Sequence, residues 1–289
     1  MGPAQGRSAD EQERASAEVA AALEFRVFNL QEDLDAALAM ASRASHLALR
    51  YFQMGVAWSS KRDGSPVTEA DRAVEELLRQ ELGERRPLDA ILGEELGHTG
   101  HHDALARVPH DRTWIIDPID GTSSFIKRSV DWRVQLALEI DGRVAVAVVD
   151  APAQGVRWWA SSGGGAFEST QQSEESPVTR RLSVSATAEP GDTNVQAYPL
   201  DNARQRLMGW NVAKLDSVVP CEVVRGLLDA FILEGSEAWD HAPWILLVEE
   251  AGGRFTDWDG GHSAHRRGGL FSNARVHPAL ATALGLVRR

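Results

Sequence analysis

Two aspartates lie close together in residues 114–125, which read WIIDPIDGTSSF. The apolar, β-branched start of this segment predicts a buried strand that ends at Asp117. Carboxylates as close in the chain as Asp117 and Asp120 repel each other unless protons or a cation neutralise them. Magnesium prefers oxygen ligands and commonly shares them with a substrate phosphate, so the pair predicts a magnesium site. Gly121 and Thr122 follow as a small turn with exposed backbone amides, which is typical of a phosphate site.

A second pair of acids, Glu94 and Glu95, follows another short apolar strand at residues 90–93. Two strands that each end in carboxylates are expected to converge on one pocket at the edge of a sheet. The alternative for either segment alone is a solvated turn whose acids only cap the backbone. The complete string from Asp117 to Thr122 favours the metal–phosphate interpretation.

The composition is that of an acidic globular protein. The chain has 289 residues, of which 43% are apolar and 25% charged, and its net charge is -12. This charge argues against nucleic acid or an anionic membrane as the main partner. No apolar run approaches the ~20 residues that span a bilayer, and no secretory signal is visible. We therefore expect a cytoplasmic protein, in which the single cysteine, Cys221, is a core residue.

Two amphipathic helices are expected to position the first carboxylates. Apolar residues recur at helical spacing from Asn29 to Phe52, and Asn29 with Glu32 resembles a capping box. Thr68 is expected to cap a second helix. Asp71 lies in the first turn of that helix, where the helix dipole favours an acid whatever its function.

The rest of the chain is expected to form an antiparallel sheet with helices packed on it. Asp141-Gly142 predicts a hairpin that joins strands at 132–140 and 144–149. Asp240 is expected at the N-cap of a late helix. The remaining expected strands are at 156–160, 166–167, 182–185, 194–198, 230–233, 254–256 and 268–271, and the remaining expected helices are at 202–210, 218–228, 240–251 and 278–286.

The sequence divides into three parts. Residues 1–28 are expected to be a flexible N-terminal extension, with a frayed helix as the alternative. Residues 29–188 are expected to form an N-terminal α+β metal-binding domain, and residues 189–289 a C-terminal α/β domain, because the composition changes near 186–192.

Three histidines after the second acidic pair are not expected to bind metal. His98, His101 and His102 lie in a stretch whose composition favours a loop. Oxygen ligands already complete a magnesium site, so these side chains are expected to be dispensable.

Four separated strings resemble the inositol monophosphatase family, whose members are magnesium-dependent, lithium-sensitive phosphomonoesterases. The likeness extends over residues 29–286 and is most specific in the last two strings. It implies an α+β fold, a layered α-β-α-β-α sandwich, and a homodimer. The strings are PVTEAD at 66–71, LGEE at 92–95, DPIDGT at 117–122, and WD at 239–240 with EAGG at 250–253.

The resemblance implies a set of metal ligands. Glu94, Asp117 and the carbonyl of Ile119 would bind one magnesium ion. Asp117, Asp120 and Asp240 would bind a second, and Glu94 could reach a third, weaker ion. A water on Asp240 would protonate the leaving group.

The resemblance also implies which residues meet the phosphate and the water. Gly121 and Thr122 would bind phosphate through their backbone amides, and Asp71 would accept a hydrogen bond from Thr122. The attacking water would be oriented by Glu94 or Thr122, so Asp71, Thr122 and Glu94 are the expected catalytic residues. Lys61 matches a lysine of the family's mobile loop.

Substrate choice is expected to depend on a pocket beside the metal site. Trp158-Trp159 and Asp216 resemble the histidinol-phosphate phosphatase branch, and Glu234 resembles the family's substrate-contacting acid. Asp216 and Glu234 bring two acids toward the substrate, in motifs with no nearby basic side chain, and Asp240 is also expected to contact the substrate. We therefore expect a small phosphorylated metabolite with an amino or hydroxyl group, histidinol phosphate first. Inositol monophosphate, or another cyclitol or sugar phosphate, is the second candidate.

A protein of another class fits the same strings: a catalytically silent regulatory protein that only binds phosphate. The chain also departs from the family pattern at Leu215, at Ser123-Ser124 and at Pro243-Trp244. These departures leave the metal ligands intact and bear on the choice of substrate.

Overall fold

The computed structural model describes residues 9–61, 63–100, 111–170, 177–199, 207, 210–213 and 219–286. The described elements, in chain order, are α1 (Ala9–Met54), β1 (Trp58–Ser60), β2 (Pro66–Thr68), α2 (Glu69–Arg85), β3 (Ala90–Gly93), β4 (Gly97–Thr99), β5 (Arg112–Asp120), α3 (Thr122–Ile126), β6 (Arg133–Ile140), β7 (Arg143–Ala151), β8 (Val156–Ser161), β9 (Gly165–Thr170), β10 (Val178–Arg181), η1 (Pro190–Asp192), β11 (Asn194–Tyr198), β12 (Asn211–Ala213), α5 (Cys221–Val224), β13 (Ala230–Glu234), α6 (Ala238–Glu250), β14 (Gly253–Asp257), β15 (Gly268–Asn273) and α7 (His277–Leu284).

The strands form two large sheets and one hairpin. An eight-stranded sheet has the order β10-β9-β8-β7-β6-β5-β3-β4, and a five-stranded sheet has the order β12-β11-β13-β15-β14. Strands β1 and β2 pair only with each other among the described residues. Most neighbouring strands are antiparallel, but β3 and β5 are parallel, so both strands run toward the same edge of the sheet. That edge is where the acids after each strand are found.

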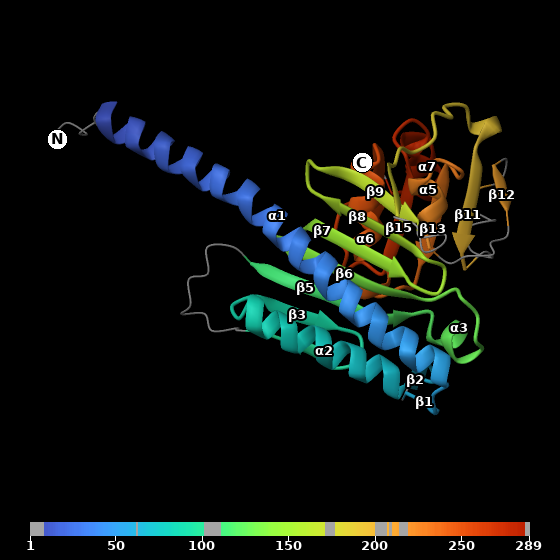
Figure 1. Cartoon of the computed structure of the whole chain (residues 1–289). Helices are drawn as coiled ribbons and strands as arrows, with labels where there is room; N and C mark the ends of the chain where they lie inside the picture. Colours follow the sequence, from blue (N-terminus) through green and yellow to red (C-terminus); the bar gives the residue numbers. More distant parts are fainter. Residues whose placement is uncertain are drawn as a thin grey trace.

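Apolar contacts arrange these elements in five layers (Figure 1). Helices α1 and α2 pack on one face of the eight-stranded sheet, where Leu78 lies in the same apolar cluster as Trp114. On the opposite face, Ile115 shares a cluster with Trp244 of α6 and with the inner face of the five-stranded sheet. Helix α7 covers the outer face of that second sheet, with Leu280 packed in its cluster. The expected α-β-α-β-α sandwich is therefore confirmed.

Strand β5 is apolar on both sides because both of its faces are covered. Trp114 and Ile115 are neighbours in the chain and are buried in different clusters, one on each face of the sheet. A strand covered on both faces reads as a continuous apolar run, since its side chains point alternately to the two faces. This explains the WII run that precedes Asp117.

The first helix begins earlier than expected. Helix α1 runs without interruption from Ala9 to Met54, so the capping box predicted at Asn29 and Glu32 is wrong. Figure 1 shows the N-terminal part of α1 projecting beyond the eight-stranded sheet. The helical spacing of apolar residues in 29–52 could be recognised in the sequence, because this part of α1 buries its apolar side chains against the eight-stranded sheet. The division at residue 28, like the one at 188, stays a prediction.

Several other boundaries differ from those expected. The strand expected at 182–185 lies instead at Val178–Arg181, paired with β9. The helix expected at 218–228 is only the short α5, because Gly226 adopts a left-handed φ of 75°. The helix expected at 202–210 falls largely outside the described residues. None of the described helices is both long enough and apolar enough to cross a bilayer.

Candidate active site

The end of β5 carries the first two carboxylates. The pairing with β6 shifts register between Asp117 and Asp120, and such an irregularity re-aims side chains at the end of a strand. Asp117 accepts a hydrogen bond of 3.0 Å from the backbone N–H of Ile119, which fixes one of its oxygens. Gly121 then reverses the chain with a φ of 86° and begins α3. A Cβ on Gly121 would lie 2.8 Å from the carbonyl oxygen of Asp131, so this turn requires glycine.

Helix α6 delivers the third carboxylate. Asp240 is the third residue of this helix rather than its N-cap, which is Glu237, so that expectation is wrong. The Asp240 carboxylate accepts a hydrogen bond of 2.6 Å from the Glu237 N–H, and its backbone carbonyl accepts one of 3.2 Å from Gln135. Ligand oxygens of Asp117, Asp120 and Asp240 all lie within 4.8 Å of one another. Two elements distant in sequence, β5 and α6, therefore converge on one acidic cluster.

Glu94 follows β3, the parallel neighbour of β5. Its backbone N–H donates to the carbonyl of Ile116 over 3.3 Å, which extends the sheet to this residue. The buried carboxylate of Glu75, from α2, accepts hydrogen bonds of 2.7 Å and 3.1 Å from the N–H groups of Glu95 and Leu96. A Cβ on residue 93 would lie 2.2 Å from a Glu75 oxygen, so the glycine there makes room for this contact. Sequence reasoning missed Glu75.

The electrostatics of the cluster favour a bound cation. Burial raises the pKa of Asp117 well above its usual value, and the charges of Glu94, Asp120 and Asp240 raise it further. Burial, and then the charge of Asp120, raises the pKa of Asp240 to about 7. Buried carboxylates that repel one another in this way are stabilised when a divalent cation replaces the protons that would otherwise neutralise them. The all-oxygen donor set fits magnesium, and Asp117, Asp120, Asp240 and Glu94 are the side chains that would hold it.

Lys61 lies against the same site. Its ammonium group is 2.7 Å from Oε1 of Glu94 and 2.6 Å from Oε1 of Glu95. Burial alone would lower the pKa of Lys61, but hydrogen bonds to the two glutamates raise it above its usual value. Burial, opposed by Lys61, raises the pKa of Glu95 to about 7. The lysine that the family likeness singled out therefore meets the acids that follow β3.

The hydrogen bond expected between Asp71 and Thr122 is present. The Thr122 hydroxyl donates to Oδ1 of Asp71 over 3.1 Å and lies 3.2 Å from the carbonyl oxygen of Ile119. The other Asp71 oxygen accepts from the N–H of Thr68 over 2.8 Å, as part of a capping box at Thr68, the predicted cap of α2. Burial raises the pKa of Asp71. The role of Ile119 as a metal ligand, and of the Gly121 and Thr122 amides as phosphate donors, stay predictions.

Arg133 is a further residue that sequence reasoning missed. Its guanidinium donates to Oδ2 of Asp120 over 3.1 Å and also pairs with Asp131, while only 3% of its side chain is exposed. Arg133 and Lys61 thus both contact carboxylates of the site, and the expected lack of a basic side chain in the motifs of Asp216 and Glu234 stays a prediction. The signal for Arg133 was a cation at the start of a mostly apolar strand, but only the register of β6 with β5 places it opposite Asp120.

Only some of the residues expected to determine substrate specificity lie in the part of the chain that the structure describes. Glu234 is half-buried at the end of β13, and Asp216 and Leu215 lie outside the described residues. Trp158 cannot line a pocket, because it is 2% exposed and its indole N–H donates to Glu168 over 2.7 Å. Trp159 points to the opposite face, where it packs near α1. The predicted tryptophan pocket is therefore wrong.

Of the three histidines, His98 is exposed on strand β4, so the loop expected there is a short strand. His101 and His102 lie outside the described residues.

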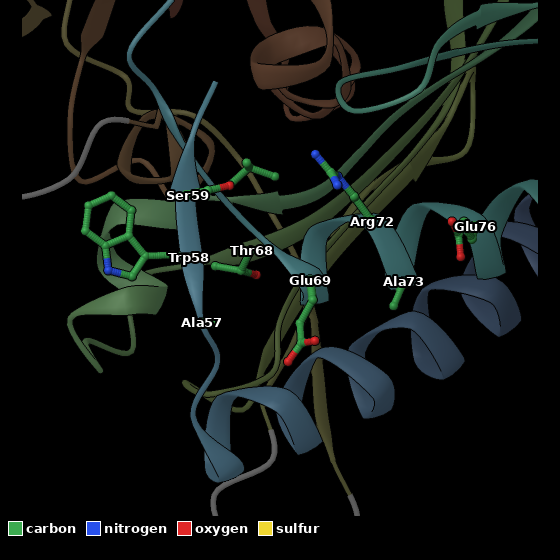
Figure 2. A pocket seen from close by; sticks show the side chains of 9 residues that line it. Ala57, Trp58, Ser59, Thr68, Glu69, Arg72, Ala73 and Glu76 are labelled. Carbon is green, nitrogen blue, oxygen red and sulfur yellow. The ribbon is translucent and has the colours of Figure 1, made fainter. Parts of the chain in front are cut away.

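A separate pocket of about 340 Å³ lies between β1 and the first turns of α2 (Figure 2). Its lining includes Thr68, whose hydroxyl donates to Asp71, so this pocket lies next to Asp71 through Thr68. None of the four site carboxylates lines it. Figure 2 shows Glu69, Arg72 and Glu76 around it, a mixture of charges that indicates no particular ligand.

Comparison with known proteins identifies the family. The chain matches the model of the inositol monophosphatase family over residues 29–287. A histidinol-phosphatase of Mycobacterium tuberculosis is 37% identical over 265 residues, which cover 88% of this chain and 98% of that protein. A Streptomyces griseus protein named glucose-1-phosphate thymidylyltransferase is 38% identical over 264 residues, which cover 89% of this chain and 97% of that protein.

Among solved structures, the Thermotoga maritima IMPase matches with a TM-score of 0.72 and 26% sequence identity. That match covers 88% of this chain and 97% of the other. The fold, the acidic cluster and the similarity to a histidinol-phosphatase agree, and they show a phosphomonoesterase. Since the family match covers nearly the whole described chain, this protein belongs to the inositol monophosphatase family.

Proposed function

We propose that this enzyme hydrolyses a small phosphomonoester with magnesium, and that histidinol phosphate is its preferred substrate. The observation that carries the proposal is the convergence of Asp117, Asp120 and Asp240, whose ligand oxygens lie within 4.8 Å of one another. The 37% identity to a histidinol-phosphatase supports the choice of substrate. An ammonium group on the substrate would pair with Asp216 or Glu234, which we propose as the substrate-contacting acids.

The proposed reaction uses the geometry of Asp71 and Thr122. Magnesium held by the carboxylates would lower the pKa of a bound water and neutralise the phosphoryl oxygens. The Thr122 hydroxyl donates a hydrogen bond to Asp71, so as the Thr122 oxygen accepts a proton from the attacking water, Thr122 passes its own hydroxyl proton to the Asp71 carboxylate. The water oxygen bonds to phosphorus as the bond from phosphorus to the alcohol oxygen breaks. The departing alkoxide takes a proton from a water on Asp240.

The second candidate substrate is inositol monophosphate or a sugar phosphate. The family's name supports a cyclitol phosphate, and the name of the Streptomyces griseus relative contains a sugar phosphate. A silent regulatory protein is disfavoured, because Glu94, Asp117, Asp120, Asp240, Asp71 and Thr122 are all present and the last two are already hydrogen-bonded. We further propose a cytoplasmic homodimer that binds two magnesium ions, with a third, weaker ion near Glu94.

The test is phosphate release from a panel of substrates, with magnesium and after removal of metal by a chelator. The panel contains histidinol phosphate, inositol 1-phosphate, glucose 1-phosphate and 3′-phosphoadenosine 5′-phosphate, and Asp117→Asn is the inactive control. We expect magnesium-dependent, lithium-inhibited release that is fastest with histidinol phosphate. Full activity without metal would contradict the proposed magnesium dependence. If 3′-phosphoadenosine 5′-phosphate were the best substrate, the proposed preference for histidinol phosphate would be wrong.

A separate arm tests nucleotidyl transfer. Thymidine triphosphate and glucose 1-phosphate are incubated with the enzyme, and pyrophosphate is measured. We expect no pyrophosphate, because the site carboxylates are arranged for attack by water on a monoester. Stoichiometric pyrophosphate release would assign the chain to the reaction named for its Streptomyces relative.

A further inference from the structure

A second cavity lies on the side of the eight-stranded sheet that α1 covers. Helix α1 crosses this face (Figure 1), and a cavity of about 490 Å³ lies between the helix and strands β7 and β8. Its lining contains no carboxylate of the metal cluster and neither Asp71 nor Thr122. Cavities of this size commonly hold small metabolites. A molecule bound here would therefore be separate from the substrate at the metal cluster.

The polar wall of this cavity is built around one guanidinium group. Asp150, near the end of β7, is 5% exposed and accepts hydrogen bonds from the Ser45 hydroxyl over 2.9 Å and from Nη2 of Arg157. Among the residues that the structure describes, Arg157 has no other partner, and its buried Nε lacks an acceptor. A guanidinium has five N–H donors in a planar fork, so Asp150 occupies only part of it. Arg157 can therefore bind a second acceptor.

Much of the remaining wall is apolar. Leu38 and Leu49 of α1 and Trp159 of β8 line the cavity, and all three are half-buried against the same apolar cluster. The Trp159 ring stacks on Phe167, with 5.8 Å between the ring centroids and 17° between the ring planes, which fixes its orientation. The cavity thus combines one hydrogen-bonding cation with apolar side chains suited to a flat apolar group.

We propose that this cavity binds a small carboxylate that carries a flat apolar group. The carboxylate pairs with Arg157, because its two oxygens in one plane match the guanidinium fork. The apolar group packs against Trp159 and the two leucines of α1. This binding site is independent of the proposed phosphatase chemistry and goes beyond it.

The charges around the cavity favour a monoanion over the other ligand classes. The titratable side chains in its lining are Arg157, Asp150 and the exposed His46. Because Asp150 already offsets part of the charge of Arg157, it would repel a dianionic phosphate more strongly than a carboxylate. A cationic ligand is disfavoured, since Asp150 is buried and already accepts from two donors.

The test is a ligand-observed NMR titration of the enzyme, in magnesium buffer, with indole-3-acetate as the flat aromatic carboxylate. Tryptamine, which carries an ammonium group on the same ring system, is the control probe. We expect indole-3-acetate to bind with a Kd of about 1 mM or lower, the range for a small ligand with one buried ring and one ion pair. Tryptamine should bind at least about tenfold more weakly. Failure of indole-3-acetate to bind, or equal binding of tryptamine, would overturn the proposal.

Two variants locate the probe in this cavity. Arg157→Lys keeps a positive charge beside Asp150 but loses the fork, so it should weaken binding of indole-3-acetate about tenfold. Leu49→Trp fills the cavity without changing Arg157 and should abolish binding. Arg143→Lys, at an exposed position of β7, is the matched control and should bind like wild type. Wild-type affinity in Arg157→Lys or in a folded Leu49→Trp contradicts the site, and if Leu49→Trp does not fold, Arg157→Lys decides.

Asp117→Asn separates this cavity from the metal cluster. Because Asp117 does not line the cavity, this variant should bind indole-3-acetate as tightly as wild type. Loss of binding in Asp117→Asn would place the probe at the metal cluster and overturn the proposal. Absence of phosphatase activity in the wild-type enzyme would contradict the proposed function alone, since binding in this cavity requires no turnover.

Discussion

At the scale of single residues, Asp71 serves the fold and the site with different oxygens. One oxygen accepts from the N–H and hydroxyl of Thr68, which begins α2, and the other accepts from the hydroxyl of Thr122. Helix capping alone would place an acid here, so the sequence could not distinguish a structural from a catalytic aspartate. The hydrogen bond across the site to Thr122 is the observation that favours a catalytic role.

Replacing Asp71 by Asn should slow the chemical step and largely spare metal binding. The amide has one acceptor oxygen, so it cannot serve both Thr68 and Thr122, and the Thr122 proton would turn to the carbonyl of Ile119. We expect kcat to fall about 10²- to 10⁴-fold, the range for loss of a general base. Steady-state kinetics at saturating magnesium measures the fall.

The matched control is Asp117→Asn, which removes a predicted metal ligand. It should abolish magnesium binding in calorimetry, whereas Asp71→Asn should bind magnesium within about threefold of wild type. Equal loss of magnesium in the two variants would refute this division of roles.

Single residues differ in how well the sequence predicted them. Asp117, Asp120 and Asp240 were predicted because their strings are specific and lie at the ends of elements. Glu75 was missed, although it lies on the buried face of α2 one helical turn after Asp71, which is the signal that could have identified it. Arg133 could not be placed, because its contact with Asp120 depends on the irregular register between β5 and β6.

At the scale of elements, α2 supports the turn that carries Glu94. Its Glu75 side chain is fully buried and accepts hydrogen bonds from Glu95, Leu96 and Arg79. This single carboxylate therefore fastens the turn after β3 to the helix that also carries Asp71. These hydrogen bonds tie α2 to the turn after β3 and so hold Glu94 in place relative to Asp71.

Glu75→Ala should destabilise the fold and raise the magnesium requirement. Removal of the carboxylate leaves two backbone N–H groups and a guanidinium without their buried acceptor, at a cost of about 2–4 kcal/mol. Denaturant unfolding measures the loss, and a magnesium titration of activity should need more metal because Glu94 is less firmly held. Glu76→Ala, at the exposed neighbouring position on α2, should change stability by less than about 0.5 kcal/mol. Similar effects of the two substitutions would show that the turn does not depend on Glu75.

Elements were predicted best where local chemistry decides them. The Asp141-Gly142 hairpin is confirmed, with φ values of 51° and 77° at its two turn residues. Boundaries were wrong where tertiary contacts decide them. Helix α1 continues through Asn29, and α6 takes Glu237 rather than Asp240 as its cap, because Asp240 bonds back to the Glu237 N–H.

At the scale of the whole molecule, the five layers place the acidic cluster where strands from the large sheet meet the start of α6. Helix α6 packs between the two sheets, so the position of Asp240 depends on the whole sandwich, while Asp117 and Asp120 depend only on β5 and its neighbours. The resemblance predicted this layering as a whole. Periodicity alone gave an antiparallel sheet with packed helices, because the contacts between layers are not local in sequence.

The same cluster should make the stability of the molecule depend jointly on pH and magnesium. Burial raises the pKa values of Glu94, Asp117, Asp120 and Asp240, the last to about 7, above the unfolded values. A carboxyl with a raised folded pKa stabilises the fold below its unfolded pKa, and that stability is lost as pH rises through the folded pKa. The metal-free enzyme should therefore have a lower Tm at about pH 8 than at about pH 6.

Magnesium binds the deprotonated carboxylates, so its stabilising effect should run in the opposite direction. The rise in Tm on adding magnesium should be larger at about pH 8 than at about pH 6, and Asp117→Asn should remove most of it at both. Carboxyls with a lowered pKa, such as Glu81 beside Arg43 and Glu168 beside Arg225, stay ionised between about pH 6 and about pH 8 and so do not change the difference in Tm between these two pH values. Differential scanning fluorimetry with and without magnesium makes the measurement. An equal or larger magnesium effect at the lower pH would show that protons and metal do not compete for this cluster.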